Sequence, residues 1–230
     1  MNLFYADPKD IAGGNIKLRD GELRHAVKVL RLRQGDELFI TDGLGALYRC
    51  RIQNMGEKMA GLSVLDVENE EPLTPELTLC IGLIKKRDRL EFAVEKAVEL
   101  GINKIVVYRG DQSEKQNVRI DRLESTALSA MKQSLGTYLP AISLCESLKS
   151  ALEQSGSDVR KIVADQDSSS GVIPKGDEKY CLIVGPEGGF SSGEKDLLTS
   201  ADSISYSLGT KRLRTETAAI AMADRFRNAL

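Results

Sequence analysis

The stretch "LIVGPEGGFSSGE" (residues 182–194) joins a short apolar run to a loop of three glycines and one proline, and then to the start of a helix. Glycine permits positive φ and lets another group approach the backbone closely. In an open α/β sheet, ligands bind beyond the carboxyl ends of the strands, where this loop would lie. The amides at the start of the next helix would also favour an anion. The stretch therefore predicts a binding loop, with a plain tight turn as the alternative.

Apolar runs and amphipathic helical stretches alternate around this loop, from Leu77 to the end of the chain. Strands are expected at 77–84, 104–108, 161–165, 181–184 and near Tyr206, and helices over about 88–100, 121–135, 192–202 and 215–229. Gly101 is expected to end the first of these helices, and Asp121 with Glu124 to form a capping box. Apolar strands without alternation are buried on both faces, so the pattern predicts an α/β fold with a parallel sheet covered by helices.

The first seventy residues have a different pattern, in which apolar and polar residues alternate between turn signals. This alternation predicts β-strands, with a tight hairpin at Asp42-Gly43. The segment "GELRHAVKVLRL" predicts a short helix with Leu23, Val27 and Leu30 on one face. The acidic, proline-punctuated stretch "VENEEPLTPEL" (67–77) marks a domain boundary, which gives domains 1–72 and 73–230.

Cysteine and histidine usage excludes several classes of enzyme. The four cysteines show no CxxC spacing and His25 is the single histidine, which argues against a zinc site and against any metal site built on those residues. The same inventory argues against a Cys-His or Ser-His-Asp hydrolase. The cysteines are expected to be reduced and mostly buried.

Membrane insertion and secretion are not expected. No apolar run approaches the roughly 20 residues that cross a bilayer, and the start "MNLFYADPKD" lacks a secretory pattern, so a cytoplasmic location is predicted. The net charge of −2 does not indicate a nucleic-acid binder either. Six basic residues between Lys17 and Arg33 nevertheless form a positive island.

The usual nucleotide-binding signatures do not occur in the chain. It has no G-x-x-x-x-G-K-[ST], and no G-x-G-x-x-G follows the first strand of the α/β region. A second marked segment follows the glycines, "SLGTKRLRTETAAIAMADRFRNAL" (207–230). It leads from Gly209 through three basic residues to an amphipathic helix with Ala218, Met222 and Phe226 aligned. Judged alone, the segment also permits a plain account, with Thr215 as an N-cap and the arginines solvated.

Taken together, "HAVKVLRLRQGDELFITDGLG", "FAVEKAVELGINKI", "LIVGPEGGFSSGE" and "LGTKRLRTETA" resemble the ribosomal RNA small subunit methyltransferase E family, uridine-N3 methyltransferases of the SPOUT superfamily. The resemblance covers essentially the whole chain, and the last two motifs are the specific ones. It implies a PUA-like RNA-binding β-barrel at 1–72 and a SPOUT methyltransferase domain with a C-terminal trefoil knot at 73–230. It also implies a homodimer, 16S ribosomal RNA of the small subunit as the partner, and S-adenosylmethionine as the cofactor.

By family position, main-chain groups and small side chains of two loops would hold the cofactor. The residues are Val184, Gly185, Pro186, Gly188, Gly189, Leu208, Gly209 and Leu213. Arg214 is the candidate that stabilises charge on the uridine ring, because a guanidinium stays protonated and presents several donors. Glu187 or Glu216 would accept the proton or position a neighbour, with a structural role slightly favoured. In the first domain, Arg24, Lys28, Arg31 and Arg33 are expected to contact RNA phosphates, although some of them would only solvate the helix face.

The sequence departs from the family in two places. Gln112 stands before Ser113 where the family commonly has an arginine, and "KQSLG" (132–136) stands where "EQSGR" is usual. Lys115 or Lys132 would be the substitutes for the lost RNA contacts. Two other functions stay open: a SPOUT methyltransferase for another RNA position, and a non-catalytic RNA-binding or ribosome-assembly module.

Overall fold

The computed structural model describes residues 2–114, 117–174, 176 and 179–229. The chain forms two compact units, one of Met1–Pro72 with Met131–Leu139 and the other of Leu73–Ala130 with Pro140–Leu230. Each unit is built on its own six-stranded sheet. Lys115 lies outside the described residues.

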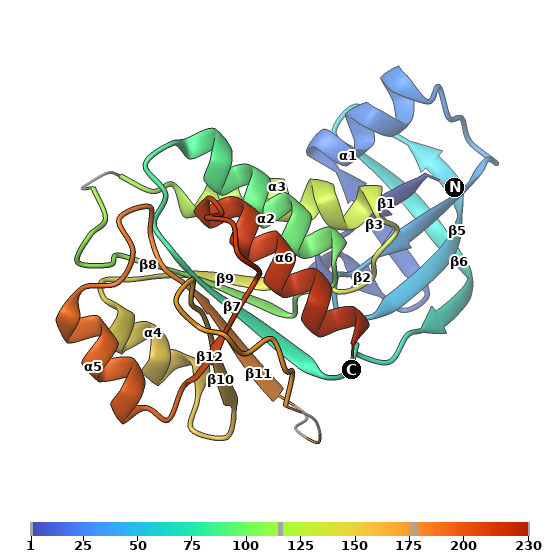
Figure 1. Cartoon of the computed structure of the whole chain (residues 1–230). Helices are drawn as coiled ribbons and strands as arrows, with labels where there is room; N and C mark the ends of the chain where they lie inside the picture. Colours follow the sequence, from blue (N-terminus) through green and yellow to red (C-terminus); the bar gives the residue numbers. More distant parts are fainter. Residues whose placement is uncertain (1, 115–116, 175, 177–178, 230) are drawn as a thin grey trace. The chain divides into compact units, whose positions relative to one another are not determined.

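The sheet of the first unit curls into a half-barrel with the strand order β1-β4-β5-β6-β3-β2 (Figure 1). Its elements are β1 (Leu3–Tyr5), η1 (Pro8–Asp10), β2 (Ile11–Ala12), β3 (Asn15–Arg19), α1 (Asp20–Arg24), η2 (His25–Val29), β4 (Glu37–Thr41), β5 (Ala46–Met55) and β6 (Met59–Asn69). The hairpin predicted at Asp42-Gly43 is confirmed, because it joins the antiparallel strands β4 and β5. The Asp42 carboxylate accepts the amide of Leu44 at 2.8 Å and that of Ala46 at 3.2 Å.

The helix predicted in the first unit has a different inner face from the one expected. Leu23 is buried and Leu30 is partly buried, but Val27 is 40% exposed and Ala26 is buried in its place. The cause is the π-helical turn η2, which adds about one residue to the turn and so shifts which side chains share a face. The prediction for Val27 was therefore wrong.

The last turn of α3 and the segment after it belong to the first unit. Thr137 donates its hydroxyl to Glu70 at 2.6 Å, and its carbonyl accepts the amide of Gly45 at 3.0 Å. The Tyr138 hydroxyl donates to the carbonyl of Glu70 at 2.7 Å. Residues distant in sequence thus complete the end of the β4–β5 hairpin.

The sheet of the second unit has the strand order β12-β10-β11-β7-β8-β9, and every pair is parallel. This confirms the predicted parallel α/β sheet. Its elements are β7 (Glu76–Gly82), α2 (Arg87–Glu99), β8 (Lys104–Tyr108), α3 (Ile120–Gln133), β9 (Ala141–Cys145), α4 (Leu148–Ser155), β10 (Arg160–Ala164), β11 (Lys179–Val184), α5 (Ser192–Ser200), β12 (Ile204–Tyr206) and α6 (Thr215–Asn228).

Helices cover both faces of this sheet, with α2 and α6 on one face and α4 and α5 on the other (Figure 1). Ala218, Met222 and Phe226 of α6 are buried, as the spacing predicts. The Phe226 ring lies 5.7 Å from Tyr180 and 5.2 Å from Tyr206, measured between centroids. Phe226 lies in the last turn of α6 and Tyr180 near the start of β11, so the first turn of α6 and the loop before it lie toward the carboxyl edge of the strands.

Three details of the second unit differ from the sequence-based expectation. The strand β9 and the helix α4 were not predicted; β9 is a half-exposed edge strand, and α4 is only eight residues long. The prediction of a capping box at Asp121 was wrong, because α3 begins at Ile120 and the Asp121 carboxylate pairs instead with Arg119. Gly101 does follow the end of α2 with φ +76°, as predicted.

All four cysteines are free and buried, in agreement with the sequence. Burial raises the pKa of Cys50 to about 12. Among the described residues no helix is long and apolar enough to span a membrane. The trefoil knot that the resemblance implies stays a prediction.

Gly45 provides a test of how residues 131–139 complete the first unit. Its φ is +107°, and an added Cβ would lie 2.3 Å from the Tyr138 hydroxyl oxygen. We expect Gly45→Ala to lower the free energy of unfolding by about 1–3 kcal/mol more than Gly35→Ala, because overpacking adds to the backbone strain. Urea denaturation of both variants measures the difference.

Gly35 is the matched control because its φ is +93° and nothing lies within 4 Å of the added Cβ. Equal losses of stability in the two variants would mean that the Tyr138 contact does not constrain the hairpin.

Candidate functional site

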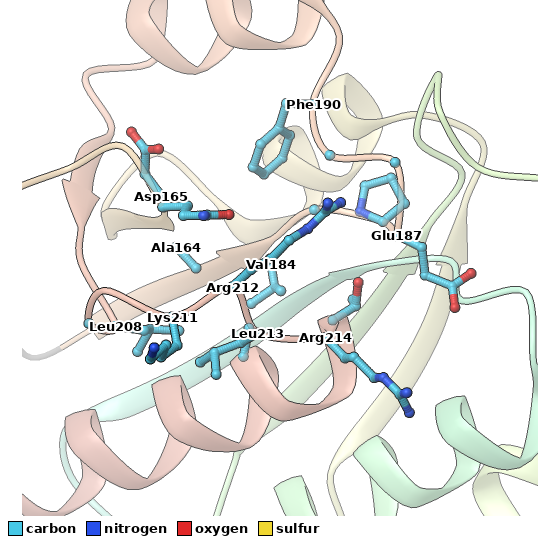
Figure 2. A pocket seen from close by; sticks show the side chains of 18 of the residues that line it. Ala164, Asp165, Val184, Glu187, Phe190, Leu208, Lys211, Arg212, Leu213 and Arg214 are labelled. Carbon is cyan, nitrogen blue, oxygen red and sulfur yellow. The ribbon is translucent and has the colours of Figure 1, made fainter.

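Two loops line one pocket of about 540 Å³ at the carboxyl edge of the second sheet (Figure 2). The glycine loop (residues 185–191) connects β11 to α5, and the basic loop (residues 207–214) connects β12 to α6. Ala164, Asp165 and Gln166, at the end of β10, form a further wall. The expectation that the two marked segments lie together is therefore confirmed.

The glycine loop is compact because its glycines leave no room for side chains. An added Cβ at Gly185 would lie 3.2 Å from the Phe190 ring, and one at Gly188 would lie 2.8 Å from the Cβ of Gln112. Gly189 has φ +77°, and its amide donates to the carbonyl of Pro186 at 2.9 Å. At its glycines the loop thus presents main chain to the pocket.

Residues of the strands β7 and β8 constrain the position of the glycine loop. An added Cβ at Gly82, the last residue of β7, would lie only 2.3 Å from the backbone nitrogen of Pro186. The buried Tyr108 hydroxyl of β8 donates to the carbonyl of Val184 at 3.1 Å. Burial raises the pKa of Tyr108 well above its ordinary value, so the phenol remains a donor.

The N-terminus of α5 is occupied by the protein's own carboxylate. Ser191 and Glu194 form a capping box, in which the Ser191 amide donates to Glu194 at 2.9 Å and the Glu194 amide donates to Ser191 at 3.1 Å. Glu194 also accepts the amide of Asp111 at 3.2 Å. Glu194 therefore takes the Ser191 amide, and the role of the helix start in binding an external anion stays a prediction.

Arg89, on α2, links the glycine loop to the start of α6. Its Nη1 lies 3.4 Å from Oε1 of Glu187, and its Nε lies 3.6 Å from Oε1 of Glu216. Glu187 also accepts the backbone amide of Lys85 at 3.1 Å. Glu216 is buried, and its Oε2 has no hydrogen-bond partner among the described residues. Sequence reasoning missed Arg89, although the run "KKRDR" (85–89) directly after a buried strand was an available signal.

The basic loop is fixed from within α6. Arg225 donates to the carbonyls of Ser207 and Leu208, at 3.3 Å each. Gly209 has φ +119°, and Arg214 is the N-cap residue of α6 without a side-chain capping bond. Thr215 is the first residue of α6 and not its N-cap, so this part of the alternative interpretation of residues 207–230 was wrong.

Comparison with known proteins gives this pocket a context. An RNA methyltransferase domain model matches residues 69–227, and an RNA methyltransferase PUA domain model matches residues 18–60. The ribosomal RNA small subunit methyltransferase E of Rickettsia conorii is 30% identical over 227 residues, 95% of this chain and 92% of the relative. The chain belongs to the ribosomal RNA small subunit methyltransferase E family.

Two further relatives agree with this membership. The Bacillus subtilis ribosomal RNA small subunit methyltransferase E is 26% identical over 214 residues, which cover 86% of this chain and 83% of the relative. The Neisseria gonorrhoeae enzyme of the same name, in a crystal structure bound to S-adenosyl methionine, has a TM-score of 0.87 at 26% identity over 100% of this chain and 98% of that chain.

The methyltransferase pocket contains most of the sequence-predicted site residues. Those that line it are Val184, Gly185, Pro186, Glu187, Gly188, Gly189, Leu208, Gly209, Leu213 and Arg214. Glu216 does not line it, but it pairs with Arg89, which also pairs with the lining residue Glu187. Phe190, which the sequence did not single out, lines it as well. So does Arg212, one of the three basic residues of the second marked segment, to which no role was assigned.

The positions at which this chain departs from the family have defined surroundings. Gln112 lies against Gly188 of the glycine loop. Lys132 forms an ion pair with Glu22 within the first unit, where both side chains are about one-fifth exposed. No group of three His, Cys, Asp or Glu residues able to hold a metal occurs in the described part of the chain.

The Arg89 bridge generates a prediction about both stability and ligand binding. We expect Arg89→Gln to lower the free energy of unfolding by about 1–3 kcal/mol, because the buried Glu216 loses its cationic neighbour. The loops that it joins should loosen, so affinity for S-adenosylmethionine should fall as well. Chemical denaturation and calorimetry measure the two effects.

Lys85→Gln serves as the control, because Lys85 pairs with Glu114 on the exposed surface beside the same loop. Its effect on stability should be much smaller than that of Arg89→Gln, because the pair is exposed to solvent. Adding Glu216→Gln to Arg89→Gln should recover part of the loss, and a strictly additive double variant would contradict the bridge.

Proposed function

We propose that this protein transfers the methyl group of S-adenosylmethionine to N3 of a uridine in 16S ribosomal RNA. The observation that carries the proposal is the single pocket formed by the glycine and basic loops, in a chain that belongs to the methyltransferase E family. The names of the relatives support the ribosomal RNA substrate. The N3 position rests on the resemblance of the sequence motifs.

The pocket suits the cofactor in size and in lining. Small-molecule sites enclose about 300–1,000 Å³, and this one encloses about 540 Å³. Aliphatic groups of Val184, Leu208 and Leu213 provide apolar walls for an adenosine. Glycine has no side chain, so main-chain groups can come within hydrogen-bonding distance of the cofactor. The residues that provide this access are Gly185, Gly188, Gly189 and Gly209, together with Pro186.

When bound, the cofactor supplies an activated methyl group on a sulfonium. The protein's contribution is then to hold the acceptor nitrogen in line with that methyl group and to exclude competing reactions. N3 of uridine becomes nucleophilic only as its imide proton leaves, and negative charge accumulates on the ring oxygens. A preorganised cation beside those oxygens lowers the barrier.

Arg214 is the proposed cation. Its side chain is exposed at the pocket and forms no ion pair or hydrogen bond with the described residues. Glu187 and Glu216 are better explained as positioning groups, because Arg89 lies between them. Figure 2 shows the Glu187 carboxylate directed away from Phe190 and the pocket centre.

The first unit is proposed to bind the RNA through Arg24, Lys28, Arg31 and Arg33. All four side chains are exposed, and none pairs with a carboxylate among the described residues. Arg31 has φ +56°, a conformation that favours glycine. Such strain costs about 1–3 kcal/mol, and an arginine kept there is consistent with a role outside folding.

The remaining parts of the proposal rest on the resemblance and on the substrate. We include a homodimer because the family resemblance implies it, and a cytoplasmic location because the small ribosomal subunit is the proposed partner. Nuclease digestion of 16S ribosomal RNA after reaction, followed by nucleoside analysis, tests the position: 3-methyluridine supports it, and another methylated nucleoside selects the alternative RNA position. Failure to bind S-adenosylmethionine in calorimetry would favour the non-catalytic module.

Arg214→Ala tests the role of the free guanidinium. We expect kcat to fall by about 10²–10³, with the Kd for S-adenosylmethionine unchanged, because the lost interaction forms with the reacting base. Arg214→Lys should retain part of the rate, since it keeps the charge but not the planar donors. An unchanged turnover in Arg214→Ala would remove this residue from the mechanism.

Arg31→Gly separates folding from RNA contact in the first unit. Stability should be equal or greater because the strain at φ +56° is relieved, while the salt dependence of RNA affinity should become shallower by about 0.7–0.9 in log–log slope. Filter binding across a salt series measures the slope. Asp202→Gly is the control, because Asp202 has φ +52° in the second unit and should show the relief alone.

A further inference from the structure

The rim of the pocket carries more positive charge than the one carboxylate of its proposed cofactor could pair with. Four exposed cations line the pocket, namely Lys195, Lys211, Arg212 and Arg214. None of them forms an ion pair with a carboxylate of the described residues. The acidic lining groups are Asp165 and Glu187, and Glu187 already lies beside Arg89.

S-adenosylmethionine cannot be the reason for this excess. Its sulfonium and ammonium groups outnumber its one carboxylate, so the molecule is a net cation. Two like charges 4 Å apart repel by about 1 kcal/mol even at the dielectric constant of water. A rim of unpaired cations therefore disfavours the cofactor slightly and is better suited to an anion.

The pocket cations and a second basic stretch lie at the same carboxyl edge of the sheet. Figure 2 shows Arg212 extending across the pocket toward the side on which Phe190 and Glu187 lie, while Lys211 lies beside Leu208 on the other side. Lys86 and Arg87 follow β7 at the same carboxyl edge of the sheet, and both are exposed without an ion pair to a described residue. The preceding Lys85 amide binds Glu187, so this second basic stretch adjoins the glycine loop.

We propose that Lys211 and Arg212 bind the backbone phosphates that flank the target nucleotide, so that the second unit holds the RNA independently of the basic island in the first. The proposal rests on the proposed function and deepens it. Phosphates on these two side chains would hold the strand across the mouth of the pocket and leave the base free to enter. The same phosphates would offset the repulsion between rim and cofactor.

The test compares the double variant Lys211→Gln/Arg212→Gln with the wild type. Binding of a uridine dodecamer and of 30S subunits is measured over a salt series, and binding of S-adenosylmethionine alone is measured by calorimetry. Two lost phosphate contacts should make the log–log salt slope for the single-stranded dodecamer shallower by about 1.4. Affinity for the cofactor alone should stay the same or increase.

Lys149→Gln/Lys179→Gln is the matched control, because both lysines are exposed in the second unit and neither lines this pocket. It removes the same charge and should leave the slope unchanged. Lys86→Gln/Arg87→Gln is a second variant for the adjoining stretch and should also lower the slope. Thermal unfolding of each variant shows that it is folded.

The proposal is overturned if the wild type and the rim variant bind the dodecamer with equal log–log salt slopes. It is also overturned if the control variant changes this slope as much as the rim variant does. A tenfold loss of affinity for S-adenosylmethionine in the rim variant, with the salt slope unchanged, would overturn it as well. Failure of the proposed function would give a different result. In that case the wild type would show no cofactor binding and no methylation, while the slope difference for the dodecamer would still report on the rim.

Discussion

The close approach of the glycine loop to the end of β7 is the constraint on which the pocket depends. The backbone of Pro186 occupies the volume that a side chain at Gly82 would fill. Tyr108 fixes the preceding carbonyl from β8, and the Ser191–Glu194 capping box fixes the loop at its other end. The loop is therefore held on three sides by groups that the parallel sheet brings to one edge.

Ion pairs also fix the position of the glycine loop relative to α6. Arg89 comes from a helix that precedes both loops in the chain, and it lies between a carboxylate of the glycine loop and one at the first turn of α6. A cation placed between two loops couples their positions. It also keeps the two carboxylates directed toward α2, which leaves the pocket rim with an excess of positive charge.

Local signals in the sequence predicted much of this arrangement. The apolar runs gave the parallel sheet, Gly101 marked the end of α2, and the glycine and basic motifs located the pocket. The misses have physical causes. Val27 was misplaced because a π-helical turn changes the helical period, and β9 was overlooked because an edge strand is only half buried. Arg89 was overlooked because its ion pairs join it to Glu187 and Glu216, far along the chain, and the basic run around it does not reveal these partners. Phe190 lies within the glycine motif itself and was passed over in favour of the glycines.

The segment Met131–Leu139 belongs to the first unit although nearly sixty residues of the second precede it in the chain. Its hydrogen bonds to Gly45 and Glu70 close the end of the β4–β5 hairpin. During synthesis, residues 1–72 leave the ribosome before the piece that completes them exists. The amino-terminal unit thus reaches its finished form only after much of the catalytic unit has been translated, and a fragment cut at Pro72 would lack part of its own structure.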